Sequence, residues 1–218
     1  MTMPAALPYV FPFAVFLFLL ALRPHVPLGA AEYPAWTVII ALSLLVSRRV
    51  LSFRLQKPVG SVVVGIAVFG IWIAPELIWP GSHSHWLFQN ALLGEWRSSF
   101  AEPFRNQTAI LALRFLRAAA LVPILEELFW RGWLMRWLIA PRFEQVPLGS
   151  YSRFSFWATA VLFAIEHGPL WDVGLLAGIA YNLWMLRCRR LGDCILAHAV
   201  TNACLSAYVV AAGRWEYW

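Results

Sequence analysis

The chain has few charged residues for its length. Of its 218 residues, 13% are Asp, Glu, Lys or Arg, whereas a soluble domain carries about 25%. Hydrophobic residues make up 61%, and the mean hydropathy is +0.67. This composition excludes a soluble globular domain and predicts an integral membrane protein. The 13 tryptophans agree with this, because Trp anchors helices at the level of the lipid headgroups.

The sequence also lacks the motifs of several common hydrolases. It contains no HExxH, which excludes a zincin helix, and neither GxSxG nor paired GxGD aspartates. Ser155 and Ser206 have no arranged catalytic partner in the sequence. The three cysteines, Cys188, Cys194 and Cys204, lie in or beside apolar segments at spacings that no metal knuckle uses. We therefore expect them to be small buried apolar side chains.

Apolar runs separated by short basic or turn segments predict an all-α, polytopic transmembrane bundle of about seven spans. Within the polar segment 81–107, a short interfacial helix is predicted around residues 86–96, with His83 and His85 in solvent. No repeat or linker divides the sequence, so residues 1–218 are predicted to form a single integral membrane domain. The predicted spans are 5–22, 34–47, 59–79, 108–139, 154–167, 173–186 and 193–212.

The lysines and arginines predict an orientation. With seven spans and a cytoplasmic N-terminus, eleven of the 17 basic residues fall on the cytoplasmic side and six on the other. The loops at 48–57, 141–153 and 187–190 carry most of the first group. The net charge of +6 therefore reflects membrane topology, and no nucleic-acid partner is expected.

Two adjacent carboxylates, Glu126 and Glu127, interrupt the apolar run at 108–139. A charge at that depth costs at least about 2.5 kcal/mol, so a function is the expected reason for it. Arg131 follows Glu127 by four residues, which places both on one helix face and predicts an ion pair. Glu126 points about 140° away from Arg131, so it is predicted to face a site that needs an acid or a base. Pro123 removes a backbone hydrogen bond and is expected to kink the helix nearby.

Further polar side chains lie in the later spans. His167 follows Phe163 by four residues, and Asn202 follows His198 by four. Counted from the assumed cytoplasmic ends, Glu126, His167, His198 and Asn202 lie about 10–22 Å along their helices. Groups on three helices at similar depth can meet in one cavity. Their chemistry fits general-base activation of water and also binding of a divalent metal.

These residues form three motifs of a known family. EELFWR at 126–131 matches EExxxR, residues 163–167 match FxxxH, and residues 198–202 match HxxxN, in the same order. The chain from 119 to 208 therefore resembles the catalytic core of the CPBP intramembrane proteases, the CAAX-protease and bacteriocin-processing enzymes. Residues 1–107 carry no motif. LGDCILAHAVTN and the closing WEYW resemble short members associated with exosortase/PEP-CTERM sorting in bacteria.

The resemblance implies an intramembrane endopeptidase of the bacterial inner membrane that cleaves a membrane-associated peptide. In that family's scheme Glu126 would activate water with the help of His167. His198 and Asn202 would bind the oxyanion. The supporting residues would be Glu127, Arg131 and Phe163.

The resemblance leaves several alternatives open. Glu126, His167 and His198 also form a zinc ligand set, so a metal-free and a zinc-dependent hydrolase both remain. Glu166 is expected to be a lipid- or loop-facing neighbour of His167, or a partner for its imidazole. The expected partners are a membrane-anchored protein or peptide substrate, the lipid bilayer and exosortase-type sorting proteins. The main rival is a non-enzymatic membrane scaffold or binding protein of a sorting complex, and the second is a small transporter or proton relay.

Overall fold

The computed structural model describes residues 4–218 and folds them into a bundle of helices, with no strand in that range. The predicted all-α membrane bundle is therefore confirmed. The helices are α1 (Leu7–Leu22), α2 (Glu32–Ser43), α3 (Pro58–Ile78), α4 (Thr108–Leu116), α5 (Val122–Glu127), α6 (Met135–Trp137), α7 (Arg153–Glu166), α8 (Trp171–Cys188) and α9 (Leu191–Ala212).

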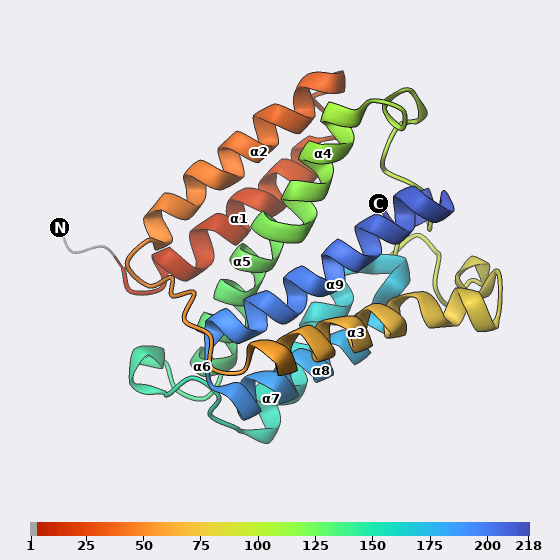
Figure 1. Ribbon diagram of the computed structural model, residues 1–218. Helices are drawn as coiled ribbons and strands as arrows, with labels where there is room; N and C mark the ends of the chain where they lie inside the picture. Colours follow the sequence, from red (N-terminus) through yellow and green to blue (C-terminus); the bar gives the residue numbers. More distant parts are fainter. Residues whose placement is uncertain (1–3) are drawn as a thin grey trace.

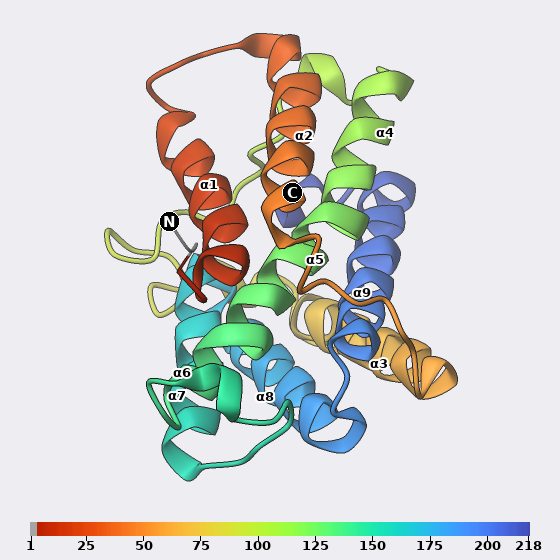
Figure 2. The ribbon, with the colours of Figure 1, turned by 90° about the vertical axis from the view of Figure 1, so that its left-hand side faces the viewer.

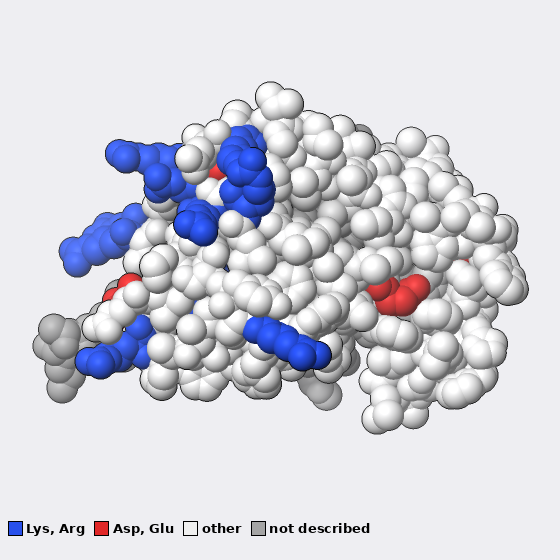
Figure 3. Space-filling model, turned by 90° about the horizontal axis from the view of Figure 1, so that it is seen from below, with Lys and Arg blue, Asp and Glu red and all other residues white. Residues whose placement is uncertain are grey.

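Within residues 4–218, four helical segments are long and apolar enough to cross a membrane: Gly29–Ser47, Pro58–Ile78, Thr108–Trp137 and Leu191–Ala212. Helix α1 is apolar but has 16 residues. The 14 residues of α7 extend about 21 Å, less than the hydrocarbon thickness of about 30 Å. Figure 3 shows Lys and Arg side chains gathered at one end of the molecule, beside a long surface almost without charge. The expectation of seven spans thus corresponds to four clear candidates and three shorter or less apolar helices.

Helices α5 and α9, which carry two of the three motifs, lie in the interior of the bundle, and α7 lies at its edge against α8 (Figures 1 and 2). Helix α9 packs along α3, α7 packs along α8, and α1 and α2 contact the long helix. Gly65 allows the close approach of α3 to α9, because a Cβ there would lie 2.5 Å from the carbonyl oxygen of Ala197. The carbonyl oxygen of Gly65 in turn accepts a hydrogen bond from Thr201 Oγ1 at 2.8 Å. These contacts hold α9 against the long helix on one side and α3 on the other.

The long helix, Thr108–Trp137, contains two π-helical segments, Arg117–Leu121 and Leu128–Leu134. In the first, the backbone N–H of Val122 donates to the carbonyl oxygen of Arg117, five residues back. In the same register residue 123 would donate to Ala118, but proline has no N–H. The sequence predicts that Pro123 kinks the helix through a missing backbone hydrogen bond. In the structure it follows a π-helical segment, and the Ala118 carbonyl oxygen lacks a backbone donor from residue 123.

The three basic loops, 48–57, 141–153 and 187–190, lie together at one end of the bundle. Gly149 in the second loop packs against Arg189 in the third. Their common location agrees with the predicted topology, while the side of the membrane that they face stays a prediction. Residues of all three loops border one small cavity: Val50, Ser52, Arg54, Leu148 and Arg190.

Asp193 lies inside α9 rather than at its first residue. The last span is predicted at 193–212, but α9 already begins at Leu191. The buried Asp193 carboxylate accepts hydrogen bonds from the backbone N–H groups of Gln56 and Lys57 at 2.9 and 2.8 Å. It therefore satisfies donors at the start of α3 and joins that helix to α9.

The interfacial helix predicted around 86–96 is wrong. The segment forms turns and an isolated β-bridge between Asn90 and Gly94. The side chain of Asn90 accepts hydrogen bonds from the backbone N–H groups of Leu92 and Leu93 at 2.9 and 3.1 Å. Such local side-chain bonds compete with helical ones, and Gly94 adopts a φ of 86° that ends any regular element.

The expectation that His83 is in solvent is also wrong, although His85 is exposed as expected. His83 is 0% exposed because two carboxylates supply acceptors for its ring. Nδ1 lies 3.1 Å from Glu76 Oε1, and Nε2 lies 3.1 Å from Asp172 Oδ1. Burial alone lowers the pKa of His83, but the hydrogen bonds and charges of Asp172 and Glu76 outweigh it and raise that pKa above its usual value. This cluster joins the ends of α3 and α8.

Candidate active site

One cavity of about 240 Å³ is lined by all four residues predicted to do chemistry, Glu126, His167, His198 and Asn202. They come from α5, from the residue that follows α7, and from α9. The cavity is enclosed further by Trp72 of α3. The residues that the sequence places at similar depths along their helices thus line the same cavity.

Arg131 lies beside this cavity as a fully buried ion pair. It is 0% exposed, and its Nη1 donates to Glu127 Oε1 at 3.0 Å, in agreement with their four-residue spacing. Its Nε donates to Asn182 Oδ1 at 3.1 Å, and its Nη2 donates to the carbonyl oxygen of Gly178 at 3.2 Å. The guanidinium carbon lies 4.8 Å from the centre of the Phe163 ring. These hydrogen bonds link the long helix to α8, and loss of one partner would leave the other charge buried without compensation.

His198 shares the carboxylate of Glu127 with that arginine. Its Nδ1 lies 3.0 Å from Glu127 Oε1, and its ring stacks on Tyr181 at 4.9 Å between centroids. Because a carboxylate accepts, we assign the hydrogen to Nδ1, which leaves Nε2 toward the cavity. Nε2 lies 3.9 Å from Glu126 Oε2. The contact between Glu127 and His198 was not predicted, since helical spacing carries no information about residues 71 positions apart.

His167 is oriented in the same way by a backbone oxygen. Its Nδ1 donates to the carbonyl oxygen of Phe163 at 2.6 Å, which leaves Nε2 as an acceptor. The ring packs between Phe163 and Trp72, at centroid distances of 4.6 and 5.1 Å. Phe163 is 1% exposed and therefore packs against the site as the sequence predicts. Both imidazoles thus have a fixed Nδ1 and a free Nε2.

Asn202 donates one amide hydrogen to the carbonyl oxygen of Ala118 at 2.9 Å. This is the oxygen that Pro123 leaves free in the π-helical segment. The second N–H of the amide and its oxygen remain available to the cavity. The irregular backbone of the long helix therefore fixes the Asn202 side chain beside the acids.

Glu126 differs from its neighbour Glu127 in having no paired cation. It is 5% exposed, and its buried Oε2 has no hydrogen-bond partner among residues 4–218. Glu166 is half-buried, and its Oε2 also lacks a partner within the described range. The hydrogen bond of His167 Nδ1 goes to the carbonyl oxygen of Phe163 rather than to Glu166.

A metal ion fits these side chains poorly. In the part of the chain that the structure describes, no three His, Cys, Asp or Glu side chains are grouped so that they could hold one. Glu126 Oε2 and His198 Nε2 lie 3.9 Å apart, and the His167 ring packs against Trp72. The zinc-dependent scheme stays a prediction.

Comparison with known proteins finds one family. Residues 108–204 match the family model described as type II CAAX prenyl endopeptidase Rce1-like. The matched range includes the three motifs and every side chain of the proposed set. No curated protein and no solved structure matches the chain. The association with exosortase systems gains no support from these comparisons.

Proposed function

We propose, from the match of residues 108–204 to the Rce1-like type II CAAX prenyl endopeptidase family model, that the protein is an intramembrane endopeptidase that uses Glu126, His167, His198 and Asn202. One observation carries the proposal. Of the two adjacent buried acids, Glu127 accepts hydrogen bonds from Arg131 and His198 at 3.0 Å. Glu126 Oε2 has no hydrogen-bond partner among residues 4–218, with His198 Nε2 at 3.9 Å, and Glu126 lines a cavity with the other three side chains.

In the proposed reaction, Glu126 takes a proton from a water molecule in the cavity. The water oxygen then forms a bond to the carbonyl carbon of the scissile peptide bond. His167, with its free Nε2, is the second acceptor that holds this water. When the tetrahedral intermediate collapses, the C–N bond breaks and Glu126 returns the proton to the leaving amine.

The oxyanion of that intermediate needs hydrogen-bond donors. The free N–H of Asn202 is one. His198 is the second donor, through Nε2 when both ring nitrogens carry hydrogen, while its Nδ1 stays on the Glu127 carboxylate at 3.0 Å. Glu127 and Arg131 therefore act as positioning residues, because they reach the reaction through His198.

The substrate class follows from the position of the cavity between apolar helices. A peptide that reaches Glu126 has to approach through the bilayer, so we propose a membrane-anchored protein or peptide in contact with lipid. The clustered basic loops support a cytoplasmic location of that end in a bacterial inner membrane, with a cytoplasmic N-terminus. Reporter fusions near Lys57 and Arg189 test this, and external activity at either position would contradict it. Exosortase-type sorting proteins remain proposed partners.

The test is cleavage by the purified protein in vesicles. The probes are a farnesylated peptide with a CAAX end and a single-span peptide, both analysed by mass spectrometry. We expect Glu126→Gln to lower the rate about 10²–10⁴-fold. The matched control is Glu95→Gln, because Glu95 is 63% exposed and paired only with the surface residue Arg97.

Full activity of both the Glu126→Gln and the His198→Ala variant would contradict the proposed protease function. A wild-type protein that binds peptides without cleaving them would favour the scaffold function.

Metal analysis distinguishes the metal-free scheme from the zinc-dependent one. We expect no stoichiometric zinc and no effect of a chelator. Stoichiometric zinc that is lost in His167→Ala and His198→Ala would overturn the metal-free scheme.

A further inference from the structure

Two arginines of the long helix, Arg114 and Arg117, line the same cavity as Glu126. Arg117 is 3% exposed, and its buried Nη1 has no hydrogen-bond partner among the described residues 4–218. The buried Nε of Arg114 also has none within that range. Burial of a cation without an acceptor is costly, so these donors call for an explanation.

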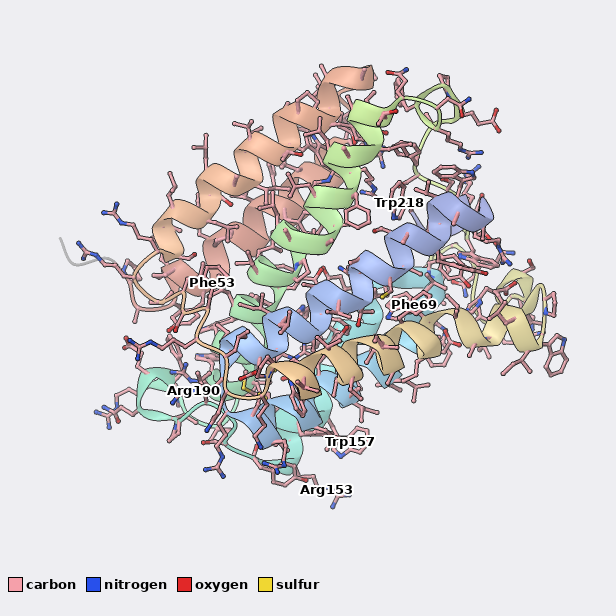
Figure 4. All side chains as sticks on the ribbon, viewed as in Figure 1. Phe53, Phe69, Arg153, Trp157, Arg190 and Trp218 are labelled. Atoms are coloured by element: carbon pink, nitrogen blue, oxygen red, sulfur yellow. The ribbon has the colours of Figure 1, made fainter. Side chains whose placement is uncertain are left out.

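Aromatic rings cover the faces of both guanidinium groups. The Arg117 carbon lies 5.8 Å from the ring centre of Tyr33 and 5.3 Å from that of Trp36. The Arg114 carbon lies 5.5 Å from the ring centre of Trp218, which packs with residues of α4 and α9 (Figure 4). Cation–π contacts use the faces of the guanidinium plane and leave its N–H edge free. The free edge is the part that binds an anion.

The nearest acid does not neutralise this pair. Glu32 is bonded to another arginine, since Arg23 Nε donates to its Oε2 at 3.0 Å. The Glu32 carboxylate is held by Arg23 and makes no hydrogen bond to Arg114 or Arg117, which leaves positive charge in excess on this side of the cavity. The site is therefore electrostatically suited to an added anion.

The arginines face inward and away from lipid. The opposite face of the same helix borders an apolar surface groove with no charged lining residue among those described. An anion bound by Arg117 is consequently inside the cavity, where a substrate reaches, rather than at the lipid headgroup level. The groove is lined by Thr108, Leu111, Ala112, Phe115, Leu116, Ala119, Ala120 and Val210.

We propose that Arg114 and Arg117 form a subsite for a carboxylate of the peptide substrate, most simply its C-terminal carboxylate. This inference rests on the proposed protease function. Arg117 precedes Glu126 by nine residues, which is about 13 Å along a helix. An extended peptide advances about 3.3–3.6 Å per residue, so its carboxylate would lie about four residues beyond the bond held at Glu126. The subsite would therefore select the end of a chain and set where it is cut.

The experiment compares two forms of one lipid-anchored peptide in vesicles, with a free C-terminal carboxylate or a C-terminal amide. We expect the wild-type protein to cleave the acid form about 10–100-fold better, mainly through KM, as hydrogen bonds to a charged group provide. Arg117→Gln should reduce this acid-to-amide ratio to near one, and Arg117→Lys should restore part of it. The control is Arg97→Gln, at a guanidinium that is 76% exposed.

A wild-type ratio of one would overturn the subsite. A lipid phosphate in the site would instead make the rate depend on anionic lipid, so phosphatidylglycerol and phosphatidylcholine vesicles are compared. An acid-to-amide ratio of one, together with a strong dependence of the rate on anionic lipid, would show that the site binds a lipid headgroup instead of the substrate carboxylate. A fluorescence assay measures how tightly the acid and amide peptides bind to the Glu126→Gln variant. This tests the subsite independently of the protease function. Preferential binding of the acid form would support the subsite even if no peptide is cleaved, and equal binding would contradict it.

Discussion

The long helix carries buried arginines in two regions that differ in their partners. Arg131 donates hydrogen bonds to Glu127, to Asn182 and to a backbone oxygen, all within 3.2 Å. Arg117 is nearly as buried, yet aromatic rings cover its guanidinium and its Nη1 has no hydrogen-bond partner among residues 4–218. The difference teaches that a satisfied buried charge is part of the fold, whereas one with free donors in a cavity is available to a ligand.

The largest effect is expected from replacing Arg131, the buried arginine whose hydrogen bonds are made. Arg131→Ala leaves the Glu127 carboxylate buried without its cation, a change that costs about 3–5 kcal/mol. Thermal unfolding in detergent should show a much lower midpoint and a poor folded yield. Arg117→Ala is the matched comparison and should cost less, because no carboxylate loses a partner. Equal losses in the two variants would break the distinction between the two regions.

A smaller effect is expected at Asn202, whose amide links the π-helical segment to the cavity. Asn202→Ala removes the donor to Ala118 and a donor to the oxyanion. Cleavage should fall about 10²–10³-fold, with a stability loss of about 1–3 kcal/mol for the buried carbonyl. Peptide cleavage rates and unfolding midpoints measure the two effects. An unchanged rate in a destabilised variant would show that Asn202 serves the helix alone.

The smallest effect is expected at the edge of the membrane, in the His83 cluster. The raised pKa of His83 means that its contribution to stability is complete below the usual value of about 6.5 and is lost as pH rises through the folded value. The midpoint of the wild type should therefore fall more between pH 6 and pH 9 than that of His83→Gln. Glu76 and Asp172 face the ring, and Arg214 lies 3.6 Å from Glu76. Parallel pH profiles of the two proteins would refute this.

Much of the fold was predictable because it depends on local pattern. Apolar runs marked the helices, and the long run at 108–139 became one helix at Thr108–Trp137. The prediction of helices failed where polar side chains form the hydrogen bonds that the backbone would make in a helix. Trp and Leu at 86–96 suggested a helix, but Asn90 satisfies the backbone locally and forms a turn.

The site was predictable to the same degree. The pair of Glu127 with Arg131 follows from four-residue spacing on one helix. The hydrogen bonds from His198 to Glu127 and from Asn202 to Ala118 join residues 71 and 84 positions apart. Such pairs depend on how helices pack, and periodicity within one helix does not encode them. The unpaired state of Arg117 likewise emerged only once its neighbours were known.

The comparison between satisfied and unsatisfied charges has its most direct test in the adjacent acids. Glu126→Gln and Glu127→Gln are measured side by side for unfolding midpoint and for cleavage per folded molecule. The account predicts that Glu126→Gln keeps a midpoint close to the wild type and loses cleavage about 10²–10⁴-fold. Glu127→Gln should lower the midpoint, because Arg131 and His198 lose their shared carboxylate. A stable Glu127→Gln beside an unstable but active Glu126→Gln would contradict the division of roles between the two acids.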